Sequence, residues 1–303
     1  MVIIVGRVHP GETNSSWVLH GVLDYLVSRE AQKLRDSLIF KIVPMINPDG
    51  VVAGNYRTSF IGKDLNRLFM PEDPTDPKYS KLDDLLKPET QAIQNLIANS
   101  KKESVKGILA FIDVHHHSQR LGSFMYGPDH PITNPKYQEV RVLPKLVSMI
   151  AKEIFRYQSC RFKKQDYKEN CARLYCEQQE NIPYSYCLEC SMQGFFTTVQ
   201  VGGSVGNALS GTARQVVQFD QPSLMLLGRK ICEGALALSN LTEIQDQKKQ
   251  ALKQRRAQKK KKGKSGKSLR KTQMSSISSK QIGDIDSVSD RSNSDLNFTN
   301  SFD

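Results

Sequence analysis

Short apolar runs that end in polar residues are the feature that most constrains the fold of this chain. "VIIV" at residues 2–5 leads into "GRVHPGE", and "GILAFIDV" at residues 107–114 leads into three consecutive histidines. Between these runs, apolar residues recur at helical spacing over residues 14–27, and "LIFKIVPM" occupies residues 38–45. A strand, a helix and a second strand in this order favour parallel pairing with a helical crossover. The sequence therefore predicts an α/β fold with a mixed, largely parallel sheet flanked by helices.

The same kind of pattern continues to about residue 244. We expect a turn at "NPDG", strands at "GSFMYG" and at residues 183–189, and helices at residues 89–99, 142–155 and 223–237. Residues 245–303 consist mainly of Gln, Lys, Arg and Ser, and such a composition cannot bury enough apolar surface to fold. We therefore expect one folded domain at residues 1–244 and a disordered tail at residues 245–303.

The positive charge of the chain is concentrated in that tail. The net charge is +12, yet residues 248–271 alone contain 13 Lys and Arg and no acidic residue, which leaves −1 for the rest of the chain. The basic composition therefore says nothing about the substrate of the folded domain. The basic segment at residues 248–271 is suited to contact polyanions such as an acidic protein surface.

The cysteines and the apolar segments indicate the cellular compartment in which the protein is expected. No run approaches the roughly 20 apolar residues of a membrane span, and "VIIV" is too short and wrongly flanked for a signal peptide. The six cysteines are expected to be reduced thiols rather than a disulfide framework. These features predict a cytoplasmic protein without a transmembrane segment.

Four side chains that suit metal-assisted hydrolysis come at or near strand ends. His9 and Glu12 form an HxxE pair directly after the first strand, and His115 follows the strand at residues 107–114. A catalytic zinc site needs three protein ligands and an open position, and two His with one Glu is a known set. Glu189, at the end of another predicted strand, supplies a carboxylate that could take a proton from water. Because open α/β sheets place their sites at the carboxyl ends of strands, we expect these four residues to meet there.

Several longer motifs carry a resemblance to a known family. "RVHPGE", "VPMINPDGVVAGNYR", "DLNR", "DVHHHS" followed by "FMYG", and "SYCLE" occur in this order between residues 1 and about 240. In these motifs the sequence closely resembles the cytosolic carboxypeptidases, the tubulin-deglutamylase branch of the M14 zinc metallocarboxypeptidases. The resemblance implies one zinc ion per chain, held by His9, Glu12 and His115, with Glu189 as the general base.

The resemblance also implies roles for residues in the connecting loops. Arg57 in "GNYR" matches the arginine that stabilises the oxyanion, and Asn66 and Arg67 in "DLNR" match the pair that holds the terminal carboxylate of the substrate. Arg173 in "KENCAR" lies where the family reads "KEGTGR", near the pocket for the departing side chain, and a cation there favours glutamate or aspartate. Lys168 is a second candidate for this cation. Tyr167 lies 22 residues before Glu189, the separation at which classical secreted carboxypeptidases place a mobile tyrosine over the substrate.

The sequence departs from the family pattern in three places. After Glu189 it reads "CSMQG", where the family tends to have small or threonine-rich residues, which would alter the wall of the pocket. The family usually has glycine between the two histidines of "DLHGH", whereas this chain has His116, which would crowd the metal, offer a wrong ligand or point away. His116 and His117 are therefore alternatives to His115 as the ligand. Family members also carry a β-rich domain and further strands before the "HPGE" turn, so we expect an N-terminally truncated form of the catalytic domain.

These observations predict a zinc metallocarboxypeptidase that hydrolyses C-terminal or side-chain-linked glutamates on protein tails such as those of tubulin. The expected partners are glutamylated or acidic C-terminal tails, and the expected location is the cytoplasm, in association with microtubules or cilia. Two other functions stay open. One is a catalytically inactive truncated paralogue that binds acidic tails, and the other is a zinc amidohydrolase of the aminoacylase type.

Overall fold

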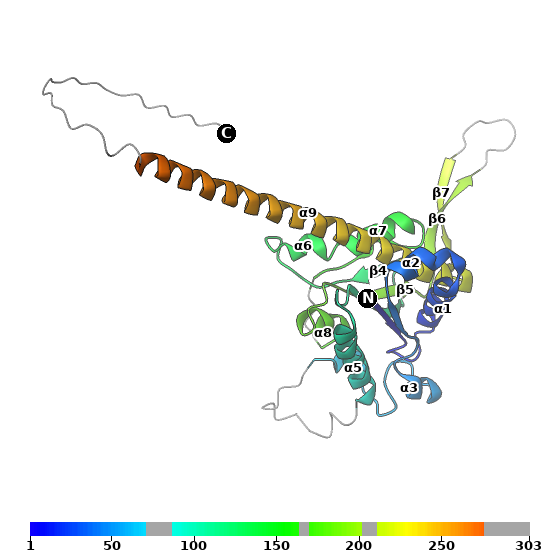
Figure 1. Ribbon diagram of the computed structural model, residues 1–303. Coiled ribbons are helices and arrows are strands. Elements are labelled where there is room, and N and C mark those ends of the chain that lie inside the picture. Colours follow the sequence, from blue (N-terminus) through cyan, green and yellow to red (C-terminus); the bar gives the residue numbers. More distant parts are fainter. Residues whose placement is uncertain (71–86, 164–169, 202–210, 276–303) are drawn as a thin grey trace, which may run out of the picture. The chain divides into compact units, whose positions relative to one another are not determined.

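The computed structural model describes residues 1–70, 87–163, 170–201 and 211–275. The chain divides into two units, residues 1–244 and residues 245–303. The first unit is built on a five-stranded sheet in the order β2-β1-β3-β5-β4 (Figure 1). The strands are β1 (Val2–Gly6), β2 (Phe40–Val43), β3 (Ala110–His117), β4 (Ser123–Tyr126) and β5 (Tyr184–Ser191).

Four of the five strands of this sheet run parallel. β1 pairs in parallel with β2 and with β3, β3 pairs in parallel with β5, and only β4 is antiparallel, at one edge. The predicted mixed, largely parallel α/β sheet is thus confirmed. The connection from β1 leads to β2 on one side, and the next strand, β3, lies on the other side of β1. This reversal makes the carboxyl ends of β1 and β3 a topological switch point, where sheets of this kind bind ligands.

In the central strands β1 and β3, alternate residues face two separate hydrophobic layers, because successive side chains of a strand point to opposite faces. Val2 and Ile4 belong to the cluster packed against α1 (Asn14–Val27), α7 (Val142–Ile150) and the first turns of α9 (Gln221–Ser275). Ile3 and Val5 belong to the cluster packed against α5 (Pro88–Glu103) and α8 (Ala172–Gln178) (Figure 1). The sheet is therefore covered by helices on both faces.

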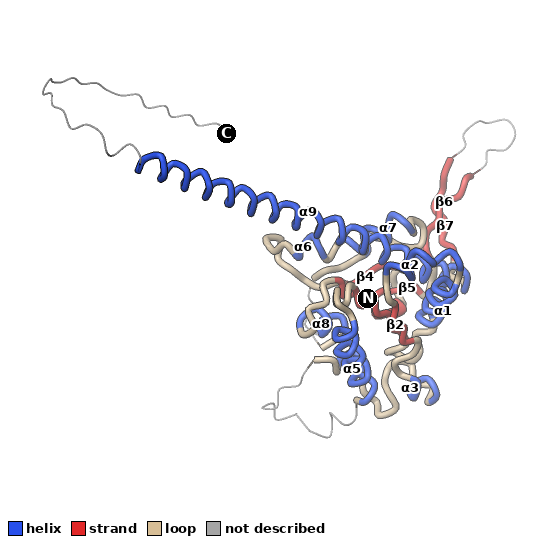
Figure 2. The backbone as a smooth tube through the Cα atoms, viewed as in Figure 1, coloured by secondary structure: helices blue, strands red, loops and turns tan. Residues whose placement is uncertain are grey.

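The shorter elements differ from the sequence expectations in two places. The "NPDG" stretch, expected as a turn, begins the helix α3 (Pro48–Val52), because the Asn47 side chain accepts from the Gly50 N–H at 3.0 Å and a proline occupies the first turn. A separate antiparallel hairpin, β6 (Phe195–Val201) with β7 (Gly211–Val217), was not predicted (Figure 2). The remaining elements are η1 (Arg29–Ala31), α2 (Gln32–Ser37), η2 (Leu65–Arg67), α6 (Lys136–Glu139) and η3 (Tyr157–Ser159).

The basic segment also differs from its expectation. We expected disorder from residue 245, whereas α9 continues as helix to Ser275. Lys, Arg, Gln and Ala are good helix formers, so the segment adopts helix although its described side chains at residues 245–256 are exposed. Residues 276–303 lie outside the described part of the chain.

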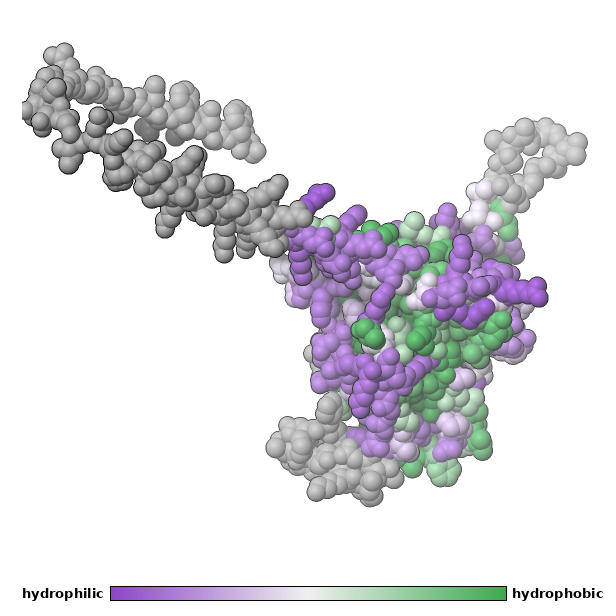
Figure 3. All heavy atoms as spheres, viewed as in Figure 1, coloured by the Kyte–Doolittle hydropathy of each residue, from purple (hydrophilic) through white to green (hydrophobic). Residues whose placement is uncertain are grey.

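The surface of the first unit mixes polar and apolar residues. Figure 3 shows hydrophilic residues over much of the visible face, with a band of hydrophobic residues among them. Several large apolar side chains are exposed, including those of Val27, Val52 and Phe60. No helix in the described ranges is long and apolar enough to cross a membrane.

Candidate metal centre

The turn after β1 presents His9 and Glu12 to the carboxyl end of the sheet. Arg7 opens this turn in the left-handed region, with φ of 55°, and its buried guanidinium donates from Nε to the Pro10 carbonyl at 2.9 Å. Its Nη1 also donates to Ser16 Oγ at 2.8 Å, on the first turn of α1. The side chain of Arg7 thereby braces the loop between the two expected ligands.

His115, near the carboxyl end of β3, completes a cluster with these two residues. The Nδ1 atoms of His9 and His115 lie 3.2 Å apart, and Glu12 places Oε1 2.7 Å from His9 Nδ1 and Oε2 2.9 Å from His115 Nδ1. Among the described His, Cys, Asp and Glu residues, this is the one group of three or more whose ligand atoms could share a metal ion. All three side chains are buried.

The chemistry and spacing of this cluster fit zinc. With metal–ligand bonds of about 2.0–2.1 Å, ligand atoms on a tetrahedral ion stand roughly 3.3 Å from one another. The two imidazole Nδ1 atoms stand 3.2 Å apart, and the Glu12 carboxylate oxygens lie 2.7 Å and 2.9 Å from them. Two His and one Glu leave the fourth position of a tetrahedral ion open, as a catalytic site requires.

Two further carboxylates hold the outward nitrogens of the histidines. His9 Nε2 lies 3.1 Å from Asp64 Oδ1, and His115 Nε2 lies 2.7 Å from Asp113 Oδ2. A carboxylate on Nε2 keeps the proton on that nitrogen and leaves Nδ1 free as a metal ligand. The sequence reasoning missed both residues. The signal for Asp113 was its place two residues before His115 in "DVH", and Asp64 begins "DLNR".

Glu12 and Asp64 are ionised at neutral pH. Burial alone would raise the pKa of Glu12, but the charge and hydrogen bond of His115, and then those of His9, hold it far below its ordinary value. Burial alone would also raise the pKa of Asp64, but the hydrogen bond and charge of His9 and the charges of Arg57 and Arg67 lower it. The cluster therefore offers negative charge to a cation, and each imidazole would offer its Nδ1 lone pair as the bound metal displaces the proton there.

Glu189 stands beside His115 on the neighbouring strand. In the parallel register of β3 and β5, His115 pairs with Glu189, so the two side chains point to the same face of the sheet. Glu189 is buried, and the Cys187 thiol donates to its Oε1 at 3.5 Å. The Glu189 carboxylate therefore lies next to His115 but is not one of the three groups that could share a metal ion.

The loop residues named from the resemblance lie around the same centre. Arg57 donates from Nη2 and Nε to Asp64 Oδ2 at 2.8 and 2.9 Å, and its side chain is 44% exposed. Asn66 is buried, with its Nδ2 3.3 Å from His115 Nε2 and its Oδ1 accepting from the Ala172 N–H at 3.0 Å. Arg67 donates to the Asn66 carbonyl at 2.7 Å.

Arg173 lies in the first turn of α8, one residue after Ala172, whose N–H bonds Asn66. Its side chain is buried, and Nη1 contacts the Cys171 sulfur at 3.2 Å. Its Nε has no hydrogen-bond partner, and none of the carboxylates in the described ranges pairs with it. The weaker candidates, Lys168 and Tyr167, lie outside the described residues.

His116 points away from the three ligand atoms. Its Nε2 lies 3.0 Å from the Tyr56 hydroxyl, and its backbone N–H donates to Glu12 Oε2 at 3.1 Å. Burial, together with the charges of His115, His9 and Arg7, lowers the pKa of His116 although Glu12 opposes the shift, so the ring is neutral at pH 7. His117 is also outside the cluster, because its Nδ1 accepts from the backbone of Gln119 and Arg120.

All six cysteines are free and buried. Burial raises the pKa of the Cys187 thiol to about 12, and it raises that of Cys190 well above its ordinary value. Thiols in this state are poor nucleophiles and poor metal ligands. The CxxC that they form in β5 is therefore part of the core of the sheet.

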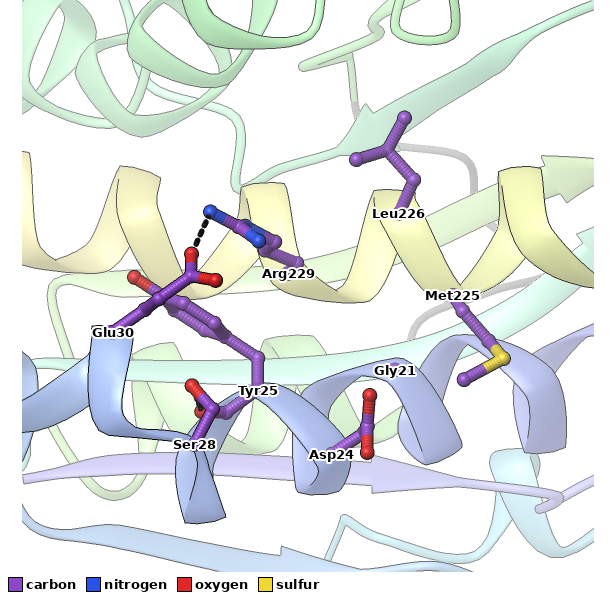
Figure 4. Close-up of a pocket in the computed structure, with 8 residues that line it drawn as sticks. All are labelled: Gly21, Asp24, Tyr25, Ser28, Glu30, Met225, Leu226 and Arg229. Carbon is purple, nitrogen blue, oxygen red and sulfur yellow. Dashed lines mark hydrogen bonds and ion pairs between the residues drawn. The ribbon is translucent and has the colours of Figure 1, made fainter.

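A separate pocket of about 200 Å³ lies between α1 and the beginning of α9 (Figure 4). It is lined by Gly21, Asp24, Tyr25, Ser28, Glu30, Met225, Leu226 and Arg229. An ion pair between Arg229 and Glu30, at 2.6 Å, crosses it. None of the expected site residues lines this pocket. The ligand turn precedes the first residue of α1, whereas Ser28 and Glu30 of the pocket follow its last residue, and a helix of 14 residues is roughly 20 Å long.

Comparison with known proteins agrees with this geometry. Residues 1–203 match the zinc carboxypeptidase family. Cytosolic carboxypeptidase 3 of Mus musculus is 34% identical over 240 residues, which are 78% of this chain and 21% of the relative. Cytosolic carboxypeptidase 1 of Homo sapiens is 35% identical over 260 residues, which are 80% of this chain and 19% of the relative. The chain thus spans about a fifth of the length of these curated relatives.

Solved structures show the same fold. The metallo-carboxypeptidase of Burkholderia cenocepacia superposes with a TM-score of 0.58 at 23% identity, over 80% of this chain and 57% of that one. A metallo-carboxypeptidase from Pseudomonas aeruginosa gives a TM-score of 0.57 at 18% identity, with coverage of 80% and 57%. From the buried His-Glu-His cluster, the sheet and these matches, we conclude that the chain belongs to the zinc carboxypeptidase family and has cytosolic carboxypeptidases as its relatives.

Proposed function

We propose that this chain is a zinc-dependent carboxypeptidase that removes C-terminal or side-chain-linked glutamates from acidic protein tails, such as those of tubulin. The observation that carries the proposal is the convergence of two imidazole Nδ1 atoms and the Glu12 carboxylate, with Glu189 in register beside them. The names of the relatives support a carboxypeptidase, and the charges of the site support the acidic substrate.

His9, Glu12 and His115 would hold the zinc ion, which when bound supplies a Lewis acid for the scissile carbonyl and for water. Glu189 accepts the proton of the attacking water and later delivers it to the leaving amine. Arg57 donates to the carbonyl oxygen as negative charge develops there. Its present partner, Asp64, also bonds His9 and so keeps the guanidinium beside the ligand cluster.

Arg173 supports the preference for a glutamate side chain. A buried cation without a described carboxylate partner is unfavourable until a ligand supplies the opposite charge. Glutamate supplies that charge, whereas a neutral side chain would leave the guanidinium unpaired. Asn66 and Arg67 are the proposed partners of the terminal carboxylate, which suits the planar fork of an arginine.

The basic segment supports an acidic partner outside the site. With 13 Lys and Arg and no acid, residues 248–271 would attract glutamate-rich tails, and the five basic residues of this segment whose burial is described are exposed. We infer from the names of the relatives and the chemistry of the proposed substrate that the protein acts in the cytoplasm, in association with microtubules or cilia.

The test is to measure zinc content together with glutamate release from a glutamylated tubulin-tail peptide, using the full-length protein and Glu189→Gln side by side. We expect one zinc per chain in both proteins and a fall in release of about 10²–10⁴-fold in the variant, because only the base is lost. Loss of zinc from Glu189→Gln would contradict the division of roles between ligands and base.

The same experiment separates the other two functions. Stoichiometric zinc without release from either protein would favour a chain that only binds acidic tails. Release from an N-acyl amino acid, with none from the peptide, would favour an amidohydrolase of the aminoacylase type.

A further inference from the structure

The histidine that replaces the usual glycine of the family makes a specific contact across the site. His116 is buried in β3, directly after the ligand His115, and its Nε2 lies 3.0 Å from the Tyr56 hydroxyl. Its Nδ1 has no hydrogen-bond partner among the described residues. The Tyr56 hydroxyl is therefore the one described group that holds the imidazole ring by a hydrogen bond.

Tyr56 is fixed at its other end to the turn that carries the ligands. Its carbonyl accepts from the Gly11 N–H at 2.7 Å. Its ring also lies so close to Gly11 that a Cβ there would stand 2.5 Å from Tyr56 Cδ2. Tyr56 therefore spans the site, from the "HPGE" turn between His9 and Glu12 to the carboxyl end of β3.

The residue that follows Tyr56 is Arg57, whose side chain bonds one described residue. The guanidinium is 44% exposed and has Asp64 as its described partner. Its position therefore depends on where the backbone of residues 55–58 is anchored. Within that loop, Asn55 donates to the carbonyls of Thr58 and Ser59, and Tyr56 provides the contacts that join the loop to the ligand turn and to β3.

We propose that Tyr56 and His116 form a latch that positions Arg57 over the metal centre. Both are positioning residues, which act through Arg57 rather than on the substrate, and the inference rests on the proposed carboxypeptidase function. A glycine at position 116 offers no side chain to Tyr56, so the latch is a property of this chain rather than of the usual family pattern.

The direct test compares Tyr56→Phe and His116→Gly with the unmodified full-length protein in glutamate release. Each variant should lower kcat by roughly 10- to 100-fold, because a small displacement of a group that acts in the transition state has an effect of this size. KM should change by less than about threefold, since the lost stabilisation belongs to the transition state. Zinc content should stay at one per chain. Unchanged kcat in Tyr56→Phe would overturn the latch, as would loss of zinc.

Two controls separate the latch from a general loss of structure. Tyr25→Phe, on α1 beside the separate pocket, removes a hydroxyl far from the metal centre and should leave kcat unchanged. His116→Gln retains a polar group that can reach Tyr56 and should recover part of the activity lost in His116→Gly. Equal activity of the Gln and Gly variants would contradict the proposed contact.

A double variant tests whether the latch acts through Arg57. If it does, adding Tyr56→Phe to Arg57→Gln should lower kcat by less than about twofold beyond the single Arg57 variant, because residues that act as a unit are not additive. If Tyr56→Phe lowers kcat in the Arg57→Gln background by the same factor as in the unmodified protein, Tyr56 acts independently of Arg57.

A binding measurement keeps the latch testable without turnover. The probe is a phosphonate analogue of a glutamyl-glutamate dipeptide, in which a charged oxygen stands where the oxyanion would form. By calorimetry, Tyr56→Phe should bind this analogue at least about tenfold more weakly than the unmodified zinc-loaded protein, while both bind free glutamate alike. If the unmodified protein binds the analogue but releases no glutamate, the proposed carboxypeptidase function is wrong, and the comparison of affinities still tests the latch. Equal affinity for the analogue would overturn the latch alone.

Discussion

Each histidine of the ligand cluster bonds a carboxylate through its outward nitrogen, and this arrangement decides which nitrogen faces the metal. In His115 the contact is with Asp113 at 2.7 Å, and both side chains are buried. Because Asp113 accepts the Nε2 proton, the proton that a metal would displace is the one on Nδ1, and the ring needs no change of tautomer to bind the ion.

Replacing Asp113 by Asn should therefore weaken zinc binding by about 10- to 100-fold, the usual effect of losing such an outer carboxylate. Competition with a chelator of known affinity measures this constant. Asp24→Asn, which changes an exposed carboxylate in the separate pocket, is the matched control and should keep the affinity of the unmodified protein. An Asp113→Asn affinity equal to that control would show that the tautomer is fixed by other contacts.

The sequence was a sufficient guide to polar residues at the ends of apolar runs and a poor guide to residues within such runs or far from them. His9, Glu12 and His115 could be named because each stands at or just beyond the end of an apolar run. Asp113 lies within β3, where a single polar residue looks like any interruption of a strand. Arg57, Asn66 and Arg67 lie in loops without periodicity, so they could be named only from the resemblance, and their roles toward substrate stay predictions.

At the scale of elements, local chemistry explains where the expected fold differs from the observed one. Continuous apolar runs predicted the parallel strands well, because a strand that is buried on both faces needs such a run. The hairpin β6 and β7 was missed although "FFTTVQV" is rich in aromatic and β-branched residues, because its partner strand begins only after residues 202–210. The packing of α5 and α8 on the same face of the sheet could not be predicted either, because it depends on long-range contacts.

A short polar network joins these two helices. Lys101 of α5 donates to Glu180 Oε2 at 2.8 Å, and Tyr175 of α8 donates to Glu180 Oε1 at 2.7 Å. Burial alone would raise the pKa of Glu180, but the hydrogen bonds from Lys101 and Tyr175 hold it below its ordinary value. A carboxyl whose pKa is lowered on folding stabilises the protein above its unfolded pKa of about 4.3, and this contribution is lost as pH falls further.

Glu180→Gln should consequently lower the free energy of unfolding by about 1–2 kcal/mol at pH 7. The difference from the unmodified protein should shrink as pH falls from 5 to 3, as followed by urea unfolding. Glu243→Gln breaks the exposed pair with Lys106 and is the matched control, with an expected effect of at most about 0.5 kcal/mol. A Glu180→Gln effect that is constant from pH 7 to pH 3 would contradict the ionic origin of the network.

At the scale of the whole molecule, charge and chemistry belong to different parts of the chain. The proposed site lies entirely in residues 1–244, which are nearly neutral together with residues 272–303, whereas residues 248–271 carry 13 positive charges. Among the residues of α9 whose burial is described, 221–256, those that are buried in the core end at Leu238 and Ser239, before the basic segment begins. We therefore expect the basic segment to contribute to the encounter with an acidic partner rather than to the packing of the core.

A chain that ends at Ile244 should cleave a short peptide with a single terminal glutamate at the same kcat and KM as the full-length protein. For a long glutamate-rich polypeptide at low ionic strength, its KM should rise at least about tenfold, because electrostatic attraction raises the rate of encounter by such factors. The KM of the full-length protein should approach that of the shortened chain as salt increases, since the ionic atmosphere screens exposed charges. Replacing Lys259, Lys260, Lys261 and Lys262 by Gln keeps the length of the segment and should reproduce part of the effect. A fall in turnover of the short peptide would place the segment within the site, and an unchanged KM for the long polypeptide would refute its role in binding.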